Sequence, residues 1–278
     1  MMTYKNLTKS FYFLFAISLS ISSCTTSKYG ATDKEYKRMA KDFSKTIKAT
    51  PPTGQYIDSL NNEQHFVGTV NMGIRKPNYV IIHHTAQDST AQTLKTFTLK
   101  RTQTSAHYVI GRDGKVYQMV NDYLRANHAG AGKWGTVTDM NSCSIGIEMD
   151  NNGVSDPWTD AQINSLCAVL ATLKKKYSIP TANFIGHADF APGRKNDPRN
   201  FPWKTLAKKG FGFWYDDILT MPPADFDTTA ALRIIGYNVS NLGNAINAFK
   251  IHFAPDGDSK TLTEPDKLIL YNLYKKYM

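Results

Sequence analysis

The sequence predicts an α/β fold in which a central mixed β-sheet is flanked by helices, with a small three-helix module at the C-terminal end. Between residues 78 and 190, short apolar runs rich in β-branched residues alternate with segments of helical periodicity, as in domains that cover a sheet with helices. After about residue 221 the periodicity is helical only. With 278 residues, 41% of them hydrophobic and 20% charged, the chain can bury a sizeable core, which excludes disorder throughout.

The first residues have the pattern of an export signal. Residues 1–10 carry two lysines and no acid, and the apolar run at 11–22 is too short for a typical membrane span. We therefore expect residues 1–23 to be a signal peptide. The run ends in ISSC, which resembles a bacterial lipobox, so Cys24 is expected to carry the lipid that holds the mature chain on a membrane surface. A plain signal peptide with an incidental Cys24 is the alternative.

Residues 24–70 are expected to form a lipid-anchored tether and N-terminal extension. This segment is polar and lysine-rich, with a helix predicted over 33–48 and a Pro-Pro break after it. Removing the signal peptide removes two lysines and no acid, so the formal charge falls from +10 to +8. A basic exported protein suits an anionic wall polymer or lipid, and export argues against nucleic acid. Cys143 and Cys167 are compatible with a disulfide or with two free thiols.

The main body is expected over residues 71–218, and hydrophobic periodicity and turn residues divide it into strands and helices. In order they are a buried strand (78–86), a helix capped by Ser89 (89–101), a hairpin around Arg-Asp-Gly (106–120), a second buried strand (144–150), an amphipathic helix (158–177) and a short final strand (183–190). A Pro-Pro break near residue 222 then separates a C-terminal module, residues 219–278, with three helical patterns.

Two histidines and an aspartate have the residue types of a metal site. His83 and His187 each close an apolar run, and Asp197 follows ten residues after the second histidine, across a Pro-Gly turn. Two imidazoles and one carboxylate that leave a fourth position open suit a catalytic zinc ion. The chain has seven histidines, which offer many such triples. Taken alone, the spacing therefore favours an ordinary charged loop near two unrelated histidines.

Five motifs change this balance, because they occur together and in a fixed order. They are YVIIHHTA, SAHYVIGRDGKVYQMV, ANHAGAGKW, SIGIEMDN and GHADFAPGRKNDP. This set resembles the zinc-dependent N-acetylmuramoyl-L-alanine amidases of the amidase-2 group, which also includes the peptidoglycan recognition proteins, over roughly residues 79–217. With the lipobox and the helical module, the arrangement is also similar to the outer-membrane lipoprotein amidase of enterobacteria. The resemblance implies hydrolysis of the bond between N-acetylmuramic acid and L-alanine in peptidoglycan or its fragments, during wall turnover and recycling.

The resemblance also implies roles for individual residues. His83, His187 and Asp197 match the ligands of one Zn²⁺ per catalytic domain. Glu148 matches the acidic residue that handles the proton of the attacking water, and Lys195 matches the positively charged residue that stabilises the developing oxyanion. On the substrate side of the cleft, His107 and His128 match family histidines. Arg194 follows in the same loop as Lys195 and is expected to reach a carboxylate of the stem peptide, with an ordinary solvated loop arginine as the alternative. One position departs from the family, because Arg199 stands where the last motif usually has glycine, which puts the substrate contacts there in doubt.

For the whole protein, we expect a monomer that binds peptidoglycan or muropeptides and no nucleic acid. It also implies a lipid anchor in the outer membrane facing the periplasm, and a module of the peptidoglycan-binding type at 219–278. A non-catalytic recognition lipoprotein is the first alternative, but such proteins usually lack a ligand or the acid, and this chain has the full set. A glycosidase with two carboxylates is the second, and it would be indifferent to a chelator.

Overall fold

The structure is a computed structural model that describes residues 27–49, 69–254 and 259–278. The signal peptide, Cys24 and most of the tether after residue 49 lie outside the described residues. Helix α1 (Gly30–Lys48) confirms the helix predicted in the N-terminal extension and begins three residues earlier than expected. The described residues from 69 onward form one compact unit. Among the helices of the described segments, none combines the length and apolar character that crossing a membrane requires.

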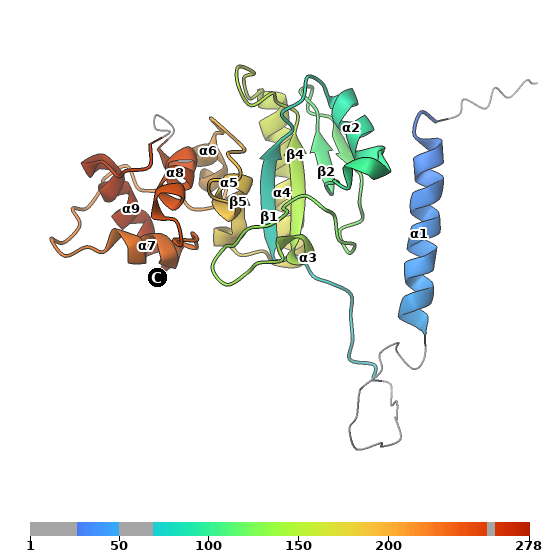
Figure 1. Cartoon of the computed structure of the whole chain (residues 1–278), viewed down its shortest axis with the longest axis horizontal. Coiled ribbons are helices and arrows are strands. Elements are labelled where there is room, and N and C mark those ends of the chain that lie inside the picture. The colour runs from blue at the N-terminus through green and yellow to red at the C-terminus, as the bar shows by residue number, and fades with distance from the viewer. Residues whose placement is uncertain (1–26, 50–68, 255–258) are drawn as a thin grey trace, which may run out of the picture. The chain divides into compact units, whose positions relative to one another are not determined.

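A five-stranded mixed sheet lies at the centre of this unit (Figure 1), as the sequence predicts. Its strands are β1 (Tyr79–His84), β2 (Tyr108–Ile110), β3 (Val116–Gln118), β4 (Ser144–Met149) and β5 (Phe184–Gly186), in the spatial order β3-β2-β4-β1-β5. Strands β2, β4, β1 and β5 run parallel, and β3 pairs antiparallel with β2 in the expected hairpin. The parallel pairs bring the carboxyl ends of β1 and β4 to the same edge.

Alternation along the strands divides the apolar side chains between two cores. On one face, Val80 and Ile82 of β1 pack against Leu166 and Leu170 of the amphipathic helix α4 (Asp160–Tyr177). On the other face, Ile81 packs with residues of the C-terminal helices. Since side chains alternate along a strand, His83 lies on the same face as Ile81, and this face carries the candidate site.

The remaining helices of the main body are short. They are α2 (Thr90–Thr98), α3 (Met140–Cys143), α5 (His187–Phe190) and α6 (Trp203–Lys208), with 3₁₀ turns at Lys100–Thr102 and Thr181–Asn183. The predicted cap of α2 is confirmed, because the Ser89 side chain accepts a hydrogen bond from the Gln92 N–H. Cys143 and Cys167 are both free thiols.

The prediction that the final strand continues to residue 190 is wrong. Strand β5 ends at Gly186, and His187 begins the single helical turn of α5. The reason is the Asp189 carboxylate, which accepts a hydrogen bond of 2.7 Å from the Gly186 N–H. A carboxylate three residues ahead satisfies the amide that begins the turn, and it thereby replaces the partner that a longer strand would need.

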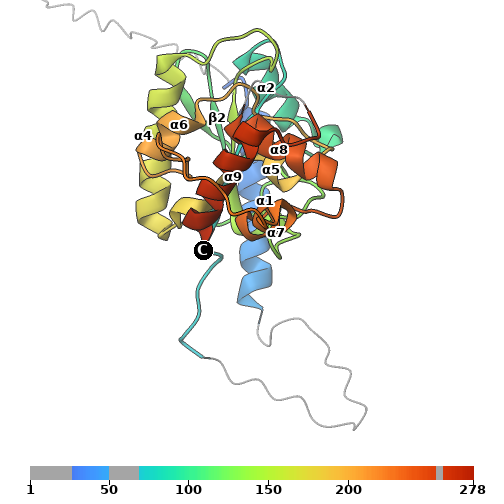
Figure 2. The same cartoon turned by 90° about the vertical axis from the view of Figure 1, so that its left-hand side faces the viewer.

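Three helices form the C-terminal module, as predicted: α7 (Thr228–Ile235), α8 (Leu242–Phe253) and α9 (Glu264–Tyr277). Figures 1 and 2 show them beside α5, beyond the β5 edge of the sheet. Their apolar side chains join those of β1 and β5 in one continuous core, in which Ile81, Ile185, Leu232, Phe249 and Leu270 are all buried. The module therefore shares a core with the sheet.

Candidate metal centre and its cleft

The register of the sheet places a histidine beside a carboxylate at the carboxyl ends of two parallel strands. His83 on β1 pairs with Glu148 on β4. In α/β sheets this edge is where ligands commonly bind. Here a cavity of about 670 Å³ opens, lined by these two residues together with His187, Lys195 and Asp197. The structure thus brings the predicted ligands and both predicted catalytic residues to one cleft.

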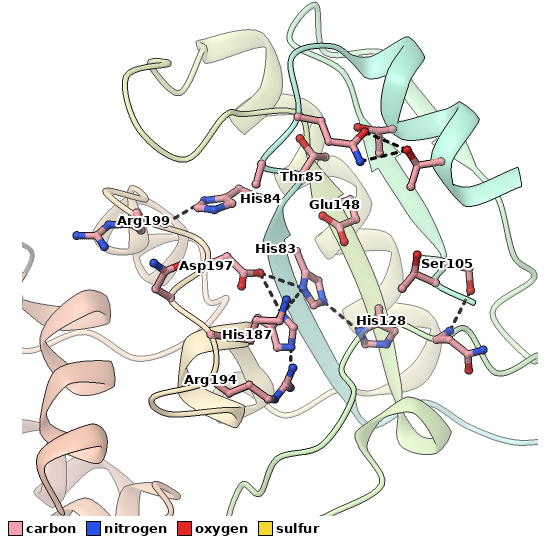
Figure 3. Close-up of a pocket in the computed structure, with 18 of the residues that line it drawn as sticks. His83, His84, Thr85, Ser105, His128, Glu148, His187, Arg194, Asp197 and Arg199 are labelled. Atoms are coloured by element: carbon pink, nitrogen blue, oxygen red, sulfur yellow. Dashed lines mark hydrogen bonds and ion pairs between the residues drawn. The ribbon is translucent and has the colours of Figure 1, made fainter. Parts of the chain in front are cut away.

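Three atoms from separate segments meet at its base (Figure 3). His83 Nδ1 lies 3.0 Å from His187 Nδ1, and each of these nitrogens lies 3.1 Å from Asp197 Oδ2. All three side chains are buried. Within the part of the chain that the structure describes, this is the group whose spacing fits a metal ion.

The proton on His187 is fixed by a backbone carbonyl. Its Nε2 lies 2.8 Å from the carbonyl oxygen of Ala129. A carbonyl oxygen can only accept, so Nε2 carries the proton and the lone pair of Nδ1 faces Asp197. Arg194 donates to the same Ala129 oxygen at 2.6 Å and to the Ala131 oxygen at 2.8 Å, which holds the turn after α5 against this loop.

The proton on His83 is fixed through a longer series of hydrogen bonds. The Ser144 hydroxyl donates to the Met140 carbonyl at 2.6 Å and therefore accepts from His128 Nε2, 3.1 Å away. His128 Nδ1 is then left to accept from His83 Nε2, also at 3.1 Å. This series leaves the His83 Nδ1 lone pair facing the other two ligand atoms. Burial, followed by the neighbouring His187, lowers the pKa of His83 to about 4, so its ring stays neutral.

This geometry tests whether the three residues suit a cation. Two imidazole lone pairs and a carboxylate oxygen converge within 3.1 Å, and the proton of each ring is committed elsewhere. Three acceptors this close repel one another unless a positive charge lies between them. Neutral imidazole and carboxylate are the ligand types that divalent transition metals take. The donor set therefore fits a metal ion.

Glu148 has a neighbourhood suited to proton transfer. Its Oε2 is buried and has no hydrogen-bond partner among the described residues. Burial, followed by the charge of Asp197, raises the pKa of Glu148 to about 8, although the charge of Lys195 opposes the shift. A carboxyl group with a pKa near neutrality can both accept and donate a proton under physiological conditions.

The histidines predicted on the substrate side have different positions. His128 lines the cleft, but both of its nitrogens are engaged, with His83 and Ser144. His107 is fully buried and does not line the cleft, so the structure does not support the predicted substrate contact. Its Nδ1 accepts from the Gly146 N–H at 3.0 Å. A Cβ atom added to Gly146 would lie only 2.3 Å from the His128 ring.

Arg199, the departure from the family motif, fits without strain. The positive φ of this loop falls on Asn200, at 49°, and asparagine tolerates that region better than most residues. The Arg199 N–H donates to His84 Nδ1 at 3.4 Å, and its carbonyl accepts from Trp158 Nε1 at 3.1 Å. Its side chain lies at the cleft, on the side away from His84 in Figure 3.

Sequence reasoning missed one wall of the cleft. Asn244 and Asn247 on α8 and Lys260 before α9 line it, although no catalytic pattern occurs in this module. Tyr237 and His252 were also missed; both contact Asp189, two residues after His187. The i, i+3 spacing of the two asparagines predicts a shared helix face. Which structure this face meets depends on tertiary packing.

Comparison with known proteins agrees with the site. Residues 73–200 match the family model Amidase_2, N-acetylmuramoyl-L-alanine amidase. The Escherichia coli N-acetylmuramoyl-L-alanine amidase AmiD is 29% identical, over 89% of this chain and 91% of that protein. The Enterobacter cloacae 1,6-anhydro-N-acetylmuramyl-L-alanine amidase AmpD is 44% identical, but over 34% of this chain and 50% of that protein.

Solved structures extend the likeness to the C-terminal helices. AmiD from E. coli, in complex with anhydro-N-acetylmuramic acid-L-Ala-D-gamma-Glu-L-Lys, superimposes with a TM-score of 0.65 at 28% identity and covers 80% of this chain and 97% of its own. AmpDh3 from Pseudomonas aeruginosa, in complex with anhydromuramic pentapeptide, gives 0.66 at 28% identity, over 80% and 98%. A likeness of this extent takes in the sheet, the cleft and the helices that follow, and the chain therefore belongs to the Amidase_2 family and is an N-acetylmuramoyl-L-alanine amidase.

Proposed function

We propose that the protein is a zinc-dependent lipoprotein amidase that cuts the bond between N-acetylmuramic acid and L-alanine, with anhydro-muropeptides among its substrates. The observation that carries the metal dependence is the convergence of two lone pairs and a carboxylate beside the unpartnered oxygen of Glu148. The substrate class is supported by AmiD and AmpDh3, which were solved with anhydro-muramyl peptides. The cleft of about 670 Å³ can hold several residues of such a ligand.

His83, His187 and Asp197 are the residues that would hold the zinc ion. Tetrahedral ligands about 2.0–2.1 Å from Zn²⁺ lie roughly 3.3 Å from one another, close to the 3.0–3.1 Å between these three atoms. Bound zinc supplies Lewis-acid polarisation of the scissile carbonyl and of the attacking water. The chain's contribution to this step is to keep His83 neutral and to orient both imidazole rings through their hydrogen bonds.

Glu148 moves the proton. Its Oε2 takes the proton of the attacking water and delivers it to the nitrogen that leaves with L-alanine, so that the amine departs neutral. The raised pKa, about 8, makes the carboxylate a stronger base than an exposed glutamate. The same carboxyl group is then a competent acid in the second half of the reaction.

Lys195 stabilises the charge that develops on the carbonyl oxygen. Its side chain lines the cleft from the turn after α5. The charge of this side chain already acts on Glu148 and on His83. An ammonium group held at this position pairs with the oxyanion in the transition state more strongly than with the neutral amide, which is the condition for catalysis.

The reaction is tested by mass spectrometry of purified muropeptides after incubation with the full chain. We expect free stem peptide beginning at L-alanine, loss of this product after chelator treatment, and recovery when zinc is returned. Cleavage of the glycan chain that continues in the presence of the chelator would indicate a glycosidase instead of an amidase. Binding of the muropeptide without any product, with or without zinc, would indicate a non-catalytic recognition protein.

Glu148→Gln and His187→Ala separate proton transfer from metal binding. We expect Glu148→Gln to lower turnover by at least about a hundredfold while zinc content by elemental analysis stays near one per chain. His187→Ala is expected to lose the metal. Near-normal turnover in Glu148→Gln would remove this residue from its role, and full zinc occupancy in His187→Ala would refute the ligand set.

The envelope location and the division of the chain belong to the same proposal. Residues 1–23 are cleaved, residues 24–70 tether the enzyme from a lipid on Cys24 in the outer membrane, 71–218 carry the catalytic site and 219–278 the helical module. The protein acts as a monomer in the periplasm. The ISSC pattern and the basic charge support this. Metabolic labelling with palmitate should mark the chain and fail in Cys24→Ser; equal labelling of both would exclude the anchor.

A further inference from the structure

Asp189 connects the metal-binding turn to the C-terminal helices. Its side chain is 1% exposed and accepts three hydrogen bonds. Oδ2 accepts from the Gly186 N–H and from His252 Nδ1, and Oδ1 accepts from the Tyr237 hydroxyl, each at 2.7 Å. The first donor belongs to the strand that precedes His187. The other two belong to the module, so a carboxylate two residues from a ligand depends on distant parts of the chain.

Both module donors are held in one orientation. The His252 ring stacks between Trp203 and Phe253, at centroid distances of 4.0 and 4.1 Å with interplanar angles of 19° and 18°. The Tyr237 ring meets Trp134 edge-on at 5.0 Å. Burial, together with the nearby Asp189, raises the pKa of Tyr237 well above its ordinary value, so the phenol keeps the proton that it donates.

The module also braces the two loops beside the metal site. The Gly135 N–H donates to the Gly236 carbonyl at 2.7 Å, six residues after the Ala129 carbonyl that fixes the His187 tautomer. On the other side, the Asn244 side chain on α8 lies against Gly193, where a Cβ atom would come within 2.1 Å of its Nδ2. Gly193 begins the turn that presents Lys195 to the cleft.

We propose that the helical module is a structural part of the metal centre, and that Tyr237 and His252 are positioning residues that hold His187 in its ligand geometry through Asp189. The turn containing His187 is four residues long, too short to keep its geometry without outside contacts. Loss of either donor leaves a buried carboxylate oxygen short of a partner, and the turn must shift to bring it solvent or another donor. This inference needs a metal at the site but not any particular substrate.

Tyr237→Phe in the full chain tests the proposal, because it removes one hydroxyl and keeps the ring. Zinc affinity is measured by competition with a chromophoric chelator, well below the unfolding midpoint of the metal-free protein. We expect the dissociation constant to rise about tenfold or more, as for other partners that orient metal ligands. Turnover should fall at limiting zinc and recover at excess zinc. Tyr271→Phe is the matched control, because this α9 tyrosine packs on Phe226 instead.

A double-mutant cycle identifies the route. If Tyr237 acts through Asp189, Tyr237→Phe should have little further effect on zinc affinity in an Asp189→Asn background. A lower unfolding midpoint with zinc affinity equal to that of Tyr271→Phe would overturn the proposal, since the module would then only pack against the domain. If Tyr237→Phe fails to fold, His252→Gln decides by the same criterion. Zinc affinity does not depend on turnover, so this outcome is independent of the amidase assignment.

Discussion

The hydroxyl of Ser144 donates its proton to the Met140 carbonyl oxygen, which can only accept. This hydrogen bond determines which ring nitrogen of His128, and then of His83, carries the proton. Without it, His128 can take its other tautomer and present an N–H toward His83 Nε2. We therefore expect Ser144→Ala to weaken zinc binding about tenfold, measured by chelator competition. The exposed neighbour Ser142, which donates to Asp139 Oδ2, gives the control Ser142→Ala. Equal affinities in the two variants would show that the series of hydrogen bonds does not fix the ligand.

Sequence reasoning reaches some of these residues and not others. His83, His187 and Asp197 were predicted because their motifs keep both residue type and local spacing. The roles of His128 and Ser144 depend on which atoms meet after folding, 61 positions apart for His83 and Ser144, and no local pattern records that. His107 shows the reverse failure, since a histidine in a family motif can serve the backbone of β4 instead of the substrate.

At the scale of elements, caps and periodicity predicted most helices, and a long-range contact decided one boundary. The strand before His187 ends early because Asp189 binds back to Gly186. The carboxylate can do so because Tyr237 and His252 bind it from the module. Within the segment, β-propensity favours a strand at the four residues NFIG and gives no clear preference for the residues that follow. The residues that hold Asp189 in this position therefore lie 48 and 63 positions away from it, outside any local sequence window.

The pairing of α8 with α9 is predicted to weaken in acid. Asp266 caps α9 through the N–H and hydroxyl of Thr263 and accepts from the buried Lys250 at 2.8 Å. Burial alone would raise the pKa of Asp266, but these hydrogen bonds outweigh it and lower the pKa. A lowered folded-state pKa gives stability above the ordinary value of about 3.9, lost as the pH falls through the folded value.

Asp266→Asn tests this by urea unfolding at several pH values. We expect the variant to lose about 3 kcal/mol at pH 7, because Lys250 keeps its charge without its partner. The difference from the unmodified protein should begin to shrink below pH ~4, where Asp266 of the unfolded chain becomes protonated, and should disappear as the pH falls through the lowered folded-state pKa. The control is Glu264→Gln on the same first turn, an exposed ion pair with Lys267 that is worth under about 1 kcal/mol. A pH-independent difference would contradict the linkage.

At the scale of the whole molecule, the sequence suggests that the main body and the C-terminal module are two pieces, whereas the described residues from 69 onward form one compact unit. The Pro-Pro break near residue 222 correctly marks where the helices begin. It does not show that Ile81 and Ile185 of the sheet share a core with Leu232 and Phe249 of the module. Sequence periodicity predicts that each of these elements has an apolar face. It does not predict which two apolar faces pack against each other.

The wall of the cleft that the C-terminal module supplies gives a prediction at this scale. Lys260 lines the cleft, and the proposed muropeptide substrates carry free carboxylates. Lys260→Ala should therefore raise KM several-fold at low ionic strength with kcat nearly unchanged. The effect should fade at high salt, because an exposed charge is screened. Lys275, exposed on α9 outside the cleft, supplies the control Lys275→Ala. A kcat loss, or the same KM in both variants, would remove Lys260 from substrate binding.

Gly146 makes two contributions to the site without touching a ligand of the metal. Its amide orients one histidine, and the absence of a side chain leaves room for the ring of another. The position is therefore intolerant of change for a reason that no inventory of catalytic groups contains. A methyl group at this position would collide with the ring of His128, the partner that orients His83, although the substitution removes no ligand and not the catalytic acid. At this position of β4 the site requires the absence of a side chain as strictly as it requires the charged groups elsewhere.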